Sequence, residues 1–175
     1  MKGGGSRITI DRILVLTIAG VSVAMDLSHM RISNGWILCS FLAGFGLCWT
    51  GAGIGPAGFI LGTLFPLLLL GWLFYFRMLG PGDIKLFCVL GGIMGPEKVL
   101  YCMGAAFAAG ALVSLGILIV CGGFQERIRY LLEFLEQYGR TGEKKPYYRT
   151  GPAWENIHFT VPIFMSVMFY AGGIY

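Results

Sequence analysis

The sequence predicts an all-α fold, that of a polytopic integral membrane protein with about six transmembrane helices, and two observations carry this prediction. Of the 175 residues, 56% are hydrophobic and 13% are charged, and the mean hydropathy is +0.73. An ordinary soluble domain has about 25% charged residues. The charges are also uneven, with five between Ile32 and Cys121 and eleven between Gly122 and Ile157. Since a charge at mid-bilayer costs about 2.5 to 3.5 kcal/mol, this distribution argues against a water-soluble monomer and indicates membrane helices with one polar loop.

Glycine, proline and charged residues divide the hydrophobic sequence into six expected helices, because a lipid-exposed backbone must satisfy its own hydrogen bonds. Arg12 precedes the first helix and Asp26 follows it, and a charge-free, glycine-rich run at 51–56 separates the second from the third. A Gly-Pro-Gly within 77–83 precedes the fourth helix, and a Gly-Pro turn at 95–98 precedes the fifth. The expected helices are Ile13–Met25, Gly35–Trp49, Ala57–Phe76, Ile84–Met94, Val99–Cys121 and His158–Ile174.

Six crossings place alternate loops on the same side of the membrane, and the basic residues divide unequally between the two sides. The larger group of nine is Arg31, Arg77, Lys85, Arg127, Arg129, Arg140, Lys144, Lys145 and Arg149, and the smaller group of four is Lys2, Arg7, Arg12 and Lys98. The positive-inside rule therefore predicts that the first side is cytoplasmic and that both termini lie outside. Asp26 and Asp83 are both expected on the cytoplasmic side.

The polar loop, residues 122–157, contains one amphipathic segment, Phe124–Tyr138. One helical face of this segment carries Phe124, Ile128, Leu131, Leu132, Leu135 and Tyr138, and most of its charges lie elsewhere. The pattern predicts a helix that lies on the cytoplasmic interface and anchors its own loop. We therefore expect a single membrane-embedded domain over residues 1–175, with this loop as its cytoplasmic part.

Asp26 and Asp83 are the charged residues that most need an explanation. The apolar run between Arg12 and Asp26 has 13 residues and Ile84–Met94 has 11, so both are shorter than the 20 or so residues that span a hydrocarbon core of about 30 Å. Ionisable groups below the lipid surface usually face a protein-lined, watered cleft and are functional. Gly80 and Gly82, directly before Asp83, permit backbone conformations with φ > 0 and close approach of another chain.

An aspartic protease needs at least two carboxyl groups that lie close together. One ionised carboxylate draws a proton from water, and one protonated carboxyl group polarises the scissile carbonyl. Like charges a few ångströms apart cannot both ionise, so such a pair holds one proton. Asp26 lies at the end of an expected helix, where the dipole disfavours negative charge, and Asp83 lies at a start, where the dipole favours it. The sequence therefore predicts Asp83 as the resting base and Asp26 as the resting acid.

The segment Gly80-Pro81-Gly82-Asp83-Ile84-Lys85-Leu86 resembles the GxGD motif, with its trailing D-x-K-L, of the type IV prepilin peptidases. Asp26, followed by Arg31-Ile32-Ser33-Asn34, is similar to the first catalytic aspartate of that family and its downstream R-x-P-N turn. Ser33 departs from the proline that the family often has there. The resemblance covers about Ile13–Met94 well and the rest of the chain through helix count.

The resemblance implies an aspartic endopeptidase of the prokaryotic cytoplasmic membrane, which removes the short basic leader of prepilins or prepilin-like proteins at the cytoplasmic face. The family cuts after a glycine that precedes the hydrophobic helix of the pilin. By this similarity Asp26 and Asp83 are the catalytic pair, Gly80 and Gly82 shape the loop, and Lys85 is a supporting residue. The chain has no CxxC motif, so the methyltransferase activity of larger members is not expected, and it looks more like the small peptidases of Tad/Flp-type pili.

Other kinds of chemistry have no pattern in the sequence. There is no HExxH, Walker loop, Rossmann fingerprint or His/Cys ligand cluster, so neither a metal nor another cofactor is indicated. The net charge of +4 comes without a basic run interleaved with aromatics outside the polar loop, which argues against nucleic acid. The expected partners are a prepilin-like protein and the lipid bilayer, and nothing in the sequence indicates an oligomeric state.

Three alternatives stay open at this point. A small transporter or channel subunit could use Asp26 and Asp83 as a proton or cation relay, although such proteins tend to carry a repeat and to hold carboxylates near mid-bilayer. A purely structural membrane component would tolerate Asp→Asn at both positions. Met1–Met25 could be a cleaved secretory signal, but the five hydrophobic segments after it favour the first helix of a bundle.

Overall fold

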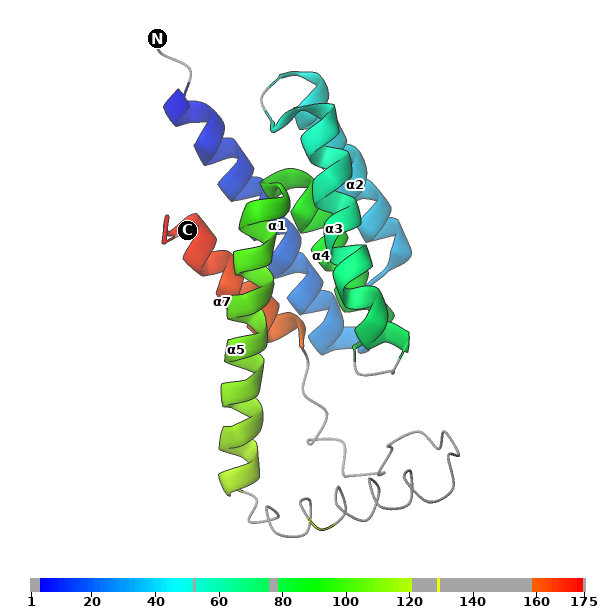
Figure 1. Cartoon of the computed structure of the whole chain (residues 1–175), viewed down its shortest axis with the longest axis vertical. Helices are drawn as coiled ribbons and strands as arrows, with labels where there is room; N and C mark the ends of the chain where they lie inside the picture. The colour runs from blue at the N-terminus through cyan, green and yellow to red at the C-terminus, as the bar shows by residue number, and fades with distance from the viewer. Residues whose placement is uncertain (1–3, 52, 76–78, 121–128, 130–158, 175) are drawn as a thin grey trace. The chain divides into compact units, whose positions relative to one another are not determined.

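The described part of the chain forms six helices (Figure 1). The computed structural model describes residues 4–51, 53–75, 79–120, 129 and 159–174. The helices are α1 (Gly4–His29), α2 (Asn34–Trp49), α3 (Gly55–Tyr75), α4 (Pro81–Met94), α5 (Pro96–Val120) and α7 (Thr160–Ala171). No strand occurs among these residues, so the all-α prediction is confirmed for them. The predicted polar loop 122–157 and its amphipathic helix Phe124–Tyr138 lie outside the described residues.

Five of the six helices begin and end within three residues of their predicted bounds, and the first does not. α1 has 26 residues instead of the expected 13. The sequence predicts that this helix lies between Arg12 and Asp26, but both residues lie within it, since a charged residue interrupts an apolar run without interrupting helical hydrogen bonding. Asp26 therefore lies in the last turn of α1, and the shortness argued from the apolar run does not hold for this helix. α4, with 14 residues, is about 21 Å long.

Membrane crossing is supported by length and composition for two of the described helices. The segments 55–75 of α3 and 96–116 of α5 are long and apolar enough to span a bilayer, whereas α2 and α7 are apolar but shorter. α3 also exposes large apolar side chains, namely Leu61, Leu64, Leu67, Leu68 and Trp72. The six predicted crossings are not confirmed by these criteria.

The chain divides into two compact units. The first consists of residues 1–109 and 158–175, and the second of residues 110–157. The first unit contains α1 to α4, most of α5 and all of α7, and it carries every side chain discussed below. Of the second unit, the structure describes the end of α5 and residue 129.

α4 is the central helix of the first unit. Figure 1 shows it among α1, α2 and α3, and its most extensive contact is with α3. Every residue of α4 from Leu86 to Met94 is buried. A Cβ on Gly62 of α3 would overlap the carbonyl oxygen of Gly91, and a Cβ on Gly91 would overlap that of Gly62. The two helices therefore touch backbone to backbone, a contact that small residues permit.

The end of the first unit remote from Asp26 is fastened by a cluster that we call the Tyr170 clamp, made of Arg12, Lys98, Tyr170 and Ala171. Arg12 Nη1 donates to the carbonyl oxygen of Ala171 at 3.2 Å. The Arg12 guanidinium and the Lys98 ammonium lie 6.0 and 5.5 Å from the centroid of the Tyr170 ring, within the range of cation–π attraction. The clamp joins the start of α1, the start of α5 and the end of α7.

Candidate active site

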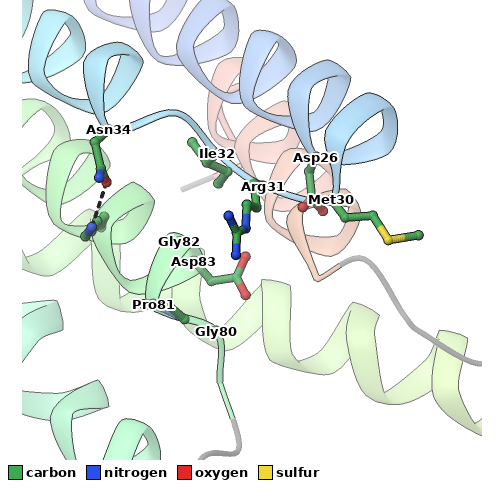
Figure 2. A pocket seen from close by; sticks show the side chains of 10 residues that line it. Asp26, Met30, Arg31, Ile32, Asn34, Gly80, Pro81, Gly82 and Asp83 are labelled. Carbon is green, nitrogen blue, oxygen red and sulfur yellow. Dashed lines mark hydrogen bonds between the residues drawn. The ribbon is translucent and has the colours of Figure 1, made fainter.

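A polar cavity opens where the end of α1, the connection to α2 and the start of α4 meet. Its volume is about 500 Å³, and its lining consists of Asp26, Met30, Arg31, Ile32, Asn34, Gly80, Pro81, Gly82, Asp83 and Lys85. Figure 2 shows the carboxylates of Asp26 and Asp83 and the guanidinium of Arg31 directed into the same space. The five residues singled out from the sequence, Asp26, Gly80, Gly82, Asp83 and Lys85, thus line one cavity.

Asp83 is held in the first turn of α4 by the way this helix begins. Gly80 is the N-cap residue, with an extended backbone, and Pro81 occupies the first helical position, where its missing N–H has no helical partner to lose. The backbone N–H of Gly80 donates to the Asp83 carboxylate, so the third helical residue reaches back to the cap as acidic residues commonly do there. The carboxylate of Asp83 is thereby fixed at the N-terminal end of α4.

Asp26 is held by a residue from the far end of the chain. The hydroxyl of Thr160, the first residue of α7, donates to Oδ2 of Asp26 at 2.7 Å. Thr160 is 1% exposed, so this hydrogen bond is sheltered from competing water. Nothing in the sequence singles out Thr160, because a threonine at a helix start ordinarily indicates only an N-cap.

The two carboxylates line one cavity, Asp26 from the last turn of α1 and Asp83 from the first turn of α4. Two like charges that face one space oppose each other's ionisation, so such a pair favours holding one proton between them. The assignment of Asp83 as the resting base and Asp26 as the resting acid stays a prediction.

The glycines of the motif act through space and not through unusual backbone angles. The φ of Gly80 is −70°, and Gly82 is not among the glycines with positive φ, so neither glycine uses the φ > 0 conformations that it permits. A Cβ on Gly80 would lie 3.1 Å from Oδ2 of Asp83, whereas a Cβ on Gly82 would lie 3.5 Å from Ile32. Gly80 therefore leaves room for the Asp83 carboxylate, and Gly82 accommodates an ordinary contact.

Lys85 connects the two motif segments. Its Nζ donates to Oδ1 of Asn34 at 2.8 Å, and both side chains are exposed (Figure 2). Lys85 lies on α4 two residues after Asp83, and Asn34 is the first residue of α2. This hydrogen bond fastens the start of α2 to the start of α4 at the cavity rim. The sequence identified both residues as motif positions, but only the structure shows that they meet.

The turn between α1 and α2 completes the cavity wall. Met30 has a φ of 52°, a left-handed conformation that ends α1, and its N–H donates to the carbonyl oxygen of Asp26 at 2.8 Å. The indole N–H of Trp36 on α2 donates to the buried hydroxyl of Ser22, one turn before Asp26, at 3.2 Å. The reversal of direction is thus fixed on both sides of Arg31, which is exposed and lines the cavity.

The donor set of the cavity does not resemble a metal centre. Among the described residues, no group of three or more His, Cys, Asp or Glu side chains is placed to hold a metal ion. His29 is exposed at the end of α1 and does not line the cavity. Two carboxylates, an arginine and a lysine around one polar cavity instead suit proton transfer to and from a bound polar group.

Comparison with known proteins adds one finding. The sequence model of the type IV leader peptidase family matches residues 13–115, a range that contains both aspartates, the GxGD segment and Lys85. No curated protein and no solved structure is significantly similar to the chain.

Proposed function

Because the chain belongs to the type IV leader peptidase family, we propose that it is an aspartic endopeptidase in which Asp26 and Asp83 are the catalytic pair. The expected substrate is a prepilin-like protein, cut after a glycine between its short basic leader and its apolar helix. The observation that carries the proposal is that α1 and α4 present their aspartates to one cavity of about 500 Å³. The electrostatic influence of Asp26 on Asp83 is the coupling that a shared proton requires.

The proposed reaction uses the two carboxyl groups in opposite roles. Ionised Asp26 takes a proton from water while the water oxygen attacks the scissile carbonyl carbon, and protonated Asp83 gives its proton to the carbonyl oxygen. When the tetrahedral intermediate collapses, the carbonyl re-forms, its hydroxyl proton returns to Asp83, and the leaving amine takes the proton from Asp26. Both carboxyl groups thereby return to their starting states. This assignment is the reverse of the one predicted from helix position, and the hydroxyl of Thr160, which donates to Oδ2 of Asp26, supports it.

We also propose that all six helices cross the cytoplasmic membrane, with the cavity on the cytoplasmic side and both termini outside. The apolar exposed face of α3 suits contact with lipid. α4 is enclosed by protein and is about 21 Å long, shorter than a hydrocarbon core of about 30 Å. Its start, and with it the cavity, would then lie below the lipid surface, where a polar substrate segment meets carboxyl groups in a partly dry site.

The transporter alternative is not favoured. Its expected hallmark was a pair of carboxylates near mid-bilayer on broken helices. Both carboxylates instead lie in the terminal turns of continuous helices, Asp26 in the last turn of α1 and Asp83 in the first turn of α4. The family match also favours a peptidase.

The proposal is tested by co-expressing the protein with a prepilin and following leader removal by the change in electrophoretic mobility. Asp26→Ala and Asp83→Ala should each abolish processing, because removing one member of a catalytic unit costs nearly as much as removing all of it. Thr17→Ala is a matched control on α1, since the Thr17 hydroxyl only donates to the carbonyl oxygen of Ile13. Processing that persists in both aspartate variants would contradict the proposed mechanism.

A further inference from the structure

The hydrogen bond between Thr160 and Asp26 is unusual for a threonine that begins a helix. Such a residue ordinarily caps its own helix by accepting a hydrogen bond from a backbone N–H. Here Phe159 is the N-cap residue, and no side chain caps α7. The Thr160 hydroxyl is instead a donor, and its acceptor is Oδ2 of Asp26 on α1 at 2.7 Å.

The start of α7 is well anchored, so the hydroxyl has little freedom to leave Asp26. Thr160 is 1% exposed and Ile163 is fully buried, and α7 packs against α1. The ring of Phe159 lies 5.2 Å, between centroids, from that of Phe107 on α5. A β-branched side chain also has few accessible rotamers in a helix. Figure 2 shows the pale red start of α7 beside Asp26.

The charges around Asp26 explain why such a donor matters. Asp26 lies in the last turn of α1, where unpaired carbonyl groups oppose negative charge. The charged groups that line the cavity with it are Asp83 from α4, which opposes its ionisation, and Arg31 and Lys85, which favour it. His29 of the same helix is exposed. The hydroxyl of Thr160, which donates to Asp26, counteracts the end of α1.

We propose that Thr160 is a positioning residue that fixes the rotation of the Asp26 carboxylate and favours its ionised form, so that Asp26 is the base which activates water. A hydroxyl donates more strongly to a carboxylate than to a carboxylic acid, so the bond favours the ionised form. This inference rests on the proposed function, because it assigns Asp26 a role in that reaction. Thr160 lies beyond residues 13–115, which match the family, so the match does not assign it.

The test compares Thr160→Val, which removes the hydroxyl at nearly constant volume, with Thr160→Ser, which keeps it. The full chain is purified in detergent and assayed on a prepilin with a basic leader that ends in glycine, and kcat and KM are measured across pH. Thr160→Val should lower kcat about 10- to 100-fold with little change in KM. The acidic limb of the pH profile of kcat for this variant should also move to higher pH, by up to about one unit, because the ionised base loses a hydrogen-bond donor. Thr160→Ser should restore both.

Ser166→Ala is the matched control. Ser166 is a buried hydroxyl on the same helix and donates to the carbonyl oxygen of Cys102 at 2.7 Å, away from the cavity. This variant loses a comparable hydrogen bond of α7 and should keep the wild-type pH profile. If Thr160→Val does not accumulate as folded protein, Thr160→Ala gives the same comparison with a smaller side chain.

Two results would overturn the inference. One is a wild-type kcat and pH profile in Thr160→Val. The other is an equal loss of kcat in Thr160→Val and Ser166→Ala with unmoved pH profiles, which would assign the effect to the packing of α7. Failure of the proposed function has a different signature, because Asp26→Asn and Asp83→Asn would then cleave the prepilin as the wild type does.

Discussion

The two ends of the first unit hold aspartates in opposite electrostatic settings. Near the Tyr170 clamp, the charged neighbour of Asp11 is the ammonium of Lys98. At the cavity, the carboxylate of Asp83 faces the same space as that of Asp26. One carboxyl group thus has an opposite charge as its neighbour, and the other has a like charge.

This difference in neighbouring charge distinguishes the Tyr170 clamp, which holds helices together, from the cavity end, which has groups suited to chemistry. The clamp joins three helices through Arg12 and Lys98, which both lie near the Tyr170 ring, and Arg12 also donates to the carbonyl oxygen of Ala171. The cavity end holds two carboxyl groups against each other beside a space of about 500 Å³. Such an arrangement destabilises the folded protein unless a proton is retained, and it is the kind of cost that proteins tolerate at functional sites.

The largest expected effect concerns α4, which leads from the cavity to the turn before Lys98. Gly62→Ala should destabilise the protein by about 3 kcal/mol, because its Cβ would overlap the Gly91 carbonyl oxygen and separate α3 from α4. Gly71→Ala on the same helix is the control, since a Cβ there meets nothing within 4 Å. Thermal unfolding in detergent measures both, and equal stability of the two variants would contradict the backbone contact.

The second prediction distinguishes Asp83 from Asp11 by pH. Asp26 and Asp83 face one cavity as like charges, so ionisation of both should destabilise the folded protein as the pH rises. Asp83→Asn should therefore be more stable than the wild type at about pH 8, by about 3 kcal/mol at most, and similar to it at about pH 4.

Asp11→Asn provides the comparison for that measurement. The charged neighbour of Asp11 is the cation Lys98 and not a second carboxylate, so this variant should change the pH dependence of stability less than Asp83→Asn does. Melting temperatures of the three proteins between about pH 4 and pH 8 decide the matter. A larger change in the pH dependence of the melting temperature for Asp11→Asn than for Asp83→Asn would contradict the proposed difference between the two ends.

The third prediction separates the motif glycines. Gly80→Ala should lower kcat about tenfold, because a Cβ 3.1 Å from Oδ2 of Asp83 displaces the carboxylate. Gly82→Ala should cause the smaller loss, since its Cβ would make an ordinary contact at 3.5 Å with Ile32. Cleavage assays of both variants at equal folded concentration measure the ranking. The reverse order would show that Gly80 does not act by leaving room for Asp83.

The smallest expected effects come from one lysine at each end. Lys85→Met removes the hydrogen bond to Asn34 and should lower kcat a few-fold, about 1 kcal/mol in the barrier, by loosening the cavity rim. Lys98→Met removes a cation from the Tyr170 ring and should cost about 0.5 to 1 kcal/mol of stability with unchanged kcat. Cleavage rates and thermal unfolding measured on both variants check this prediction. A loss of kcat in Lys98→Met equal to that in Lys85→Met would contradict it.

Much of the site could be predicted from the sequence because its signals are local. Asp83 and its two glycines occur in one seven-residue segment, and the scarcity of charge between Ile32 and Cys121 made Asp83 conspicuous. The family resemblance then added Asp26 and Lys85. Glycine and proline predict the bounds of five helices. The exception is α1, in which the charged residues Arg12 and Asp26 lie within the helix and do not end it.

The rest depends on contacts between distant parts of the chain. Thr160 meets Asp26 across 134 residues, and Lys85 meets Asn34 across 51, and no local pattern encodes either pairing. The same holds for the surroundings of the two aspartates. The position of Asp83 in its helix can be read from sequence, but the cavity that it shares with Asp26 cannot.

The most direct test of the central claim is prepilin cleavage by three purified carboxamide variants in one assay. Asp26→Asn and Asp83→Asn should each lose about 10³-fold or more in kcat, and Asp11→Asn, at the Tyr170 clamp, should cleave at the wild-type rate. All three variants should give folded protein, as judged by thermal unfolding. Cleavage by Asp26→Asn or Asp83→Asn at the rate of Asp11→Asn would contradict a catalytic pair at the cavity.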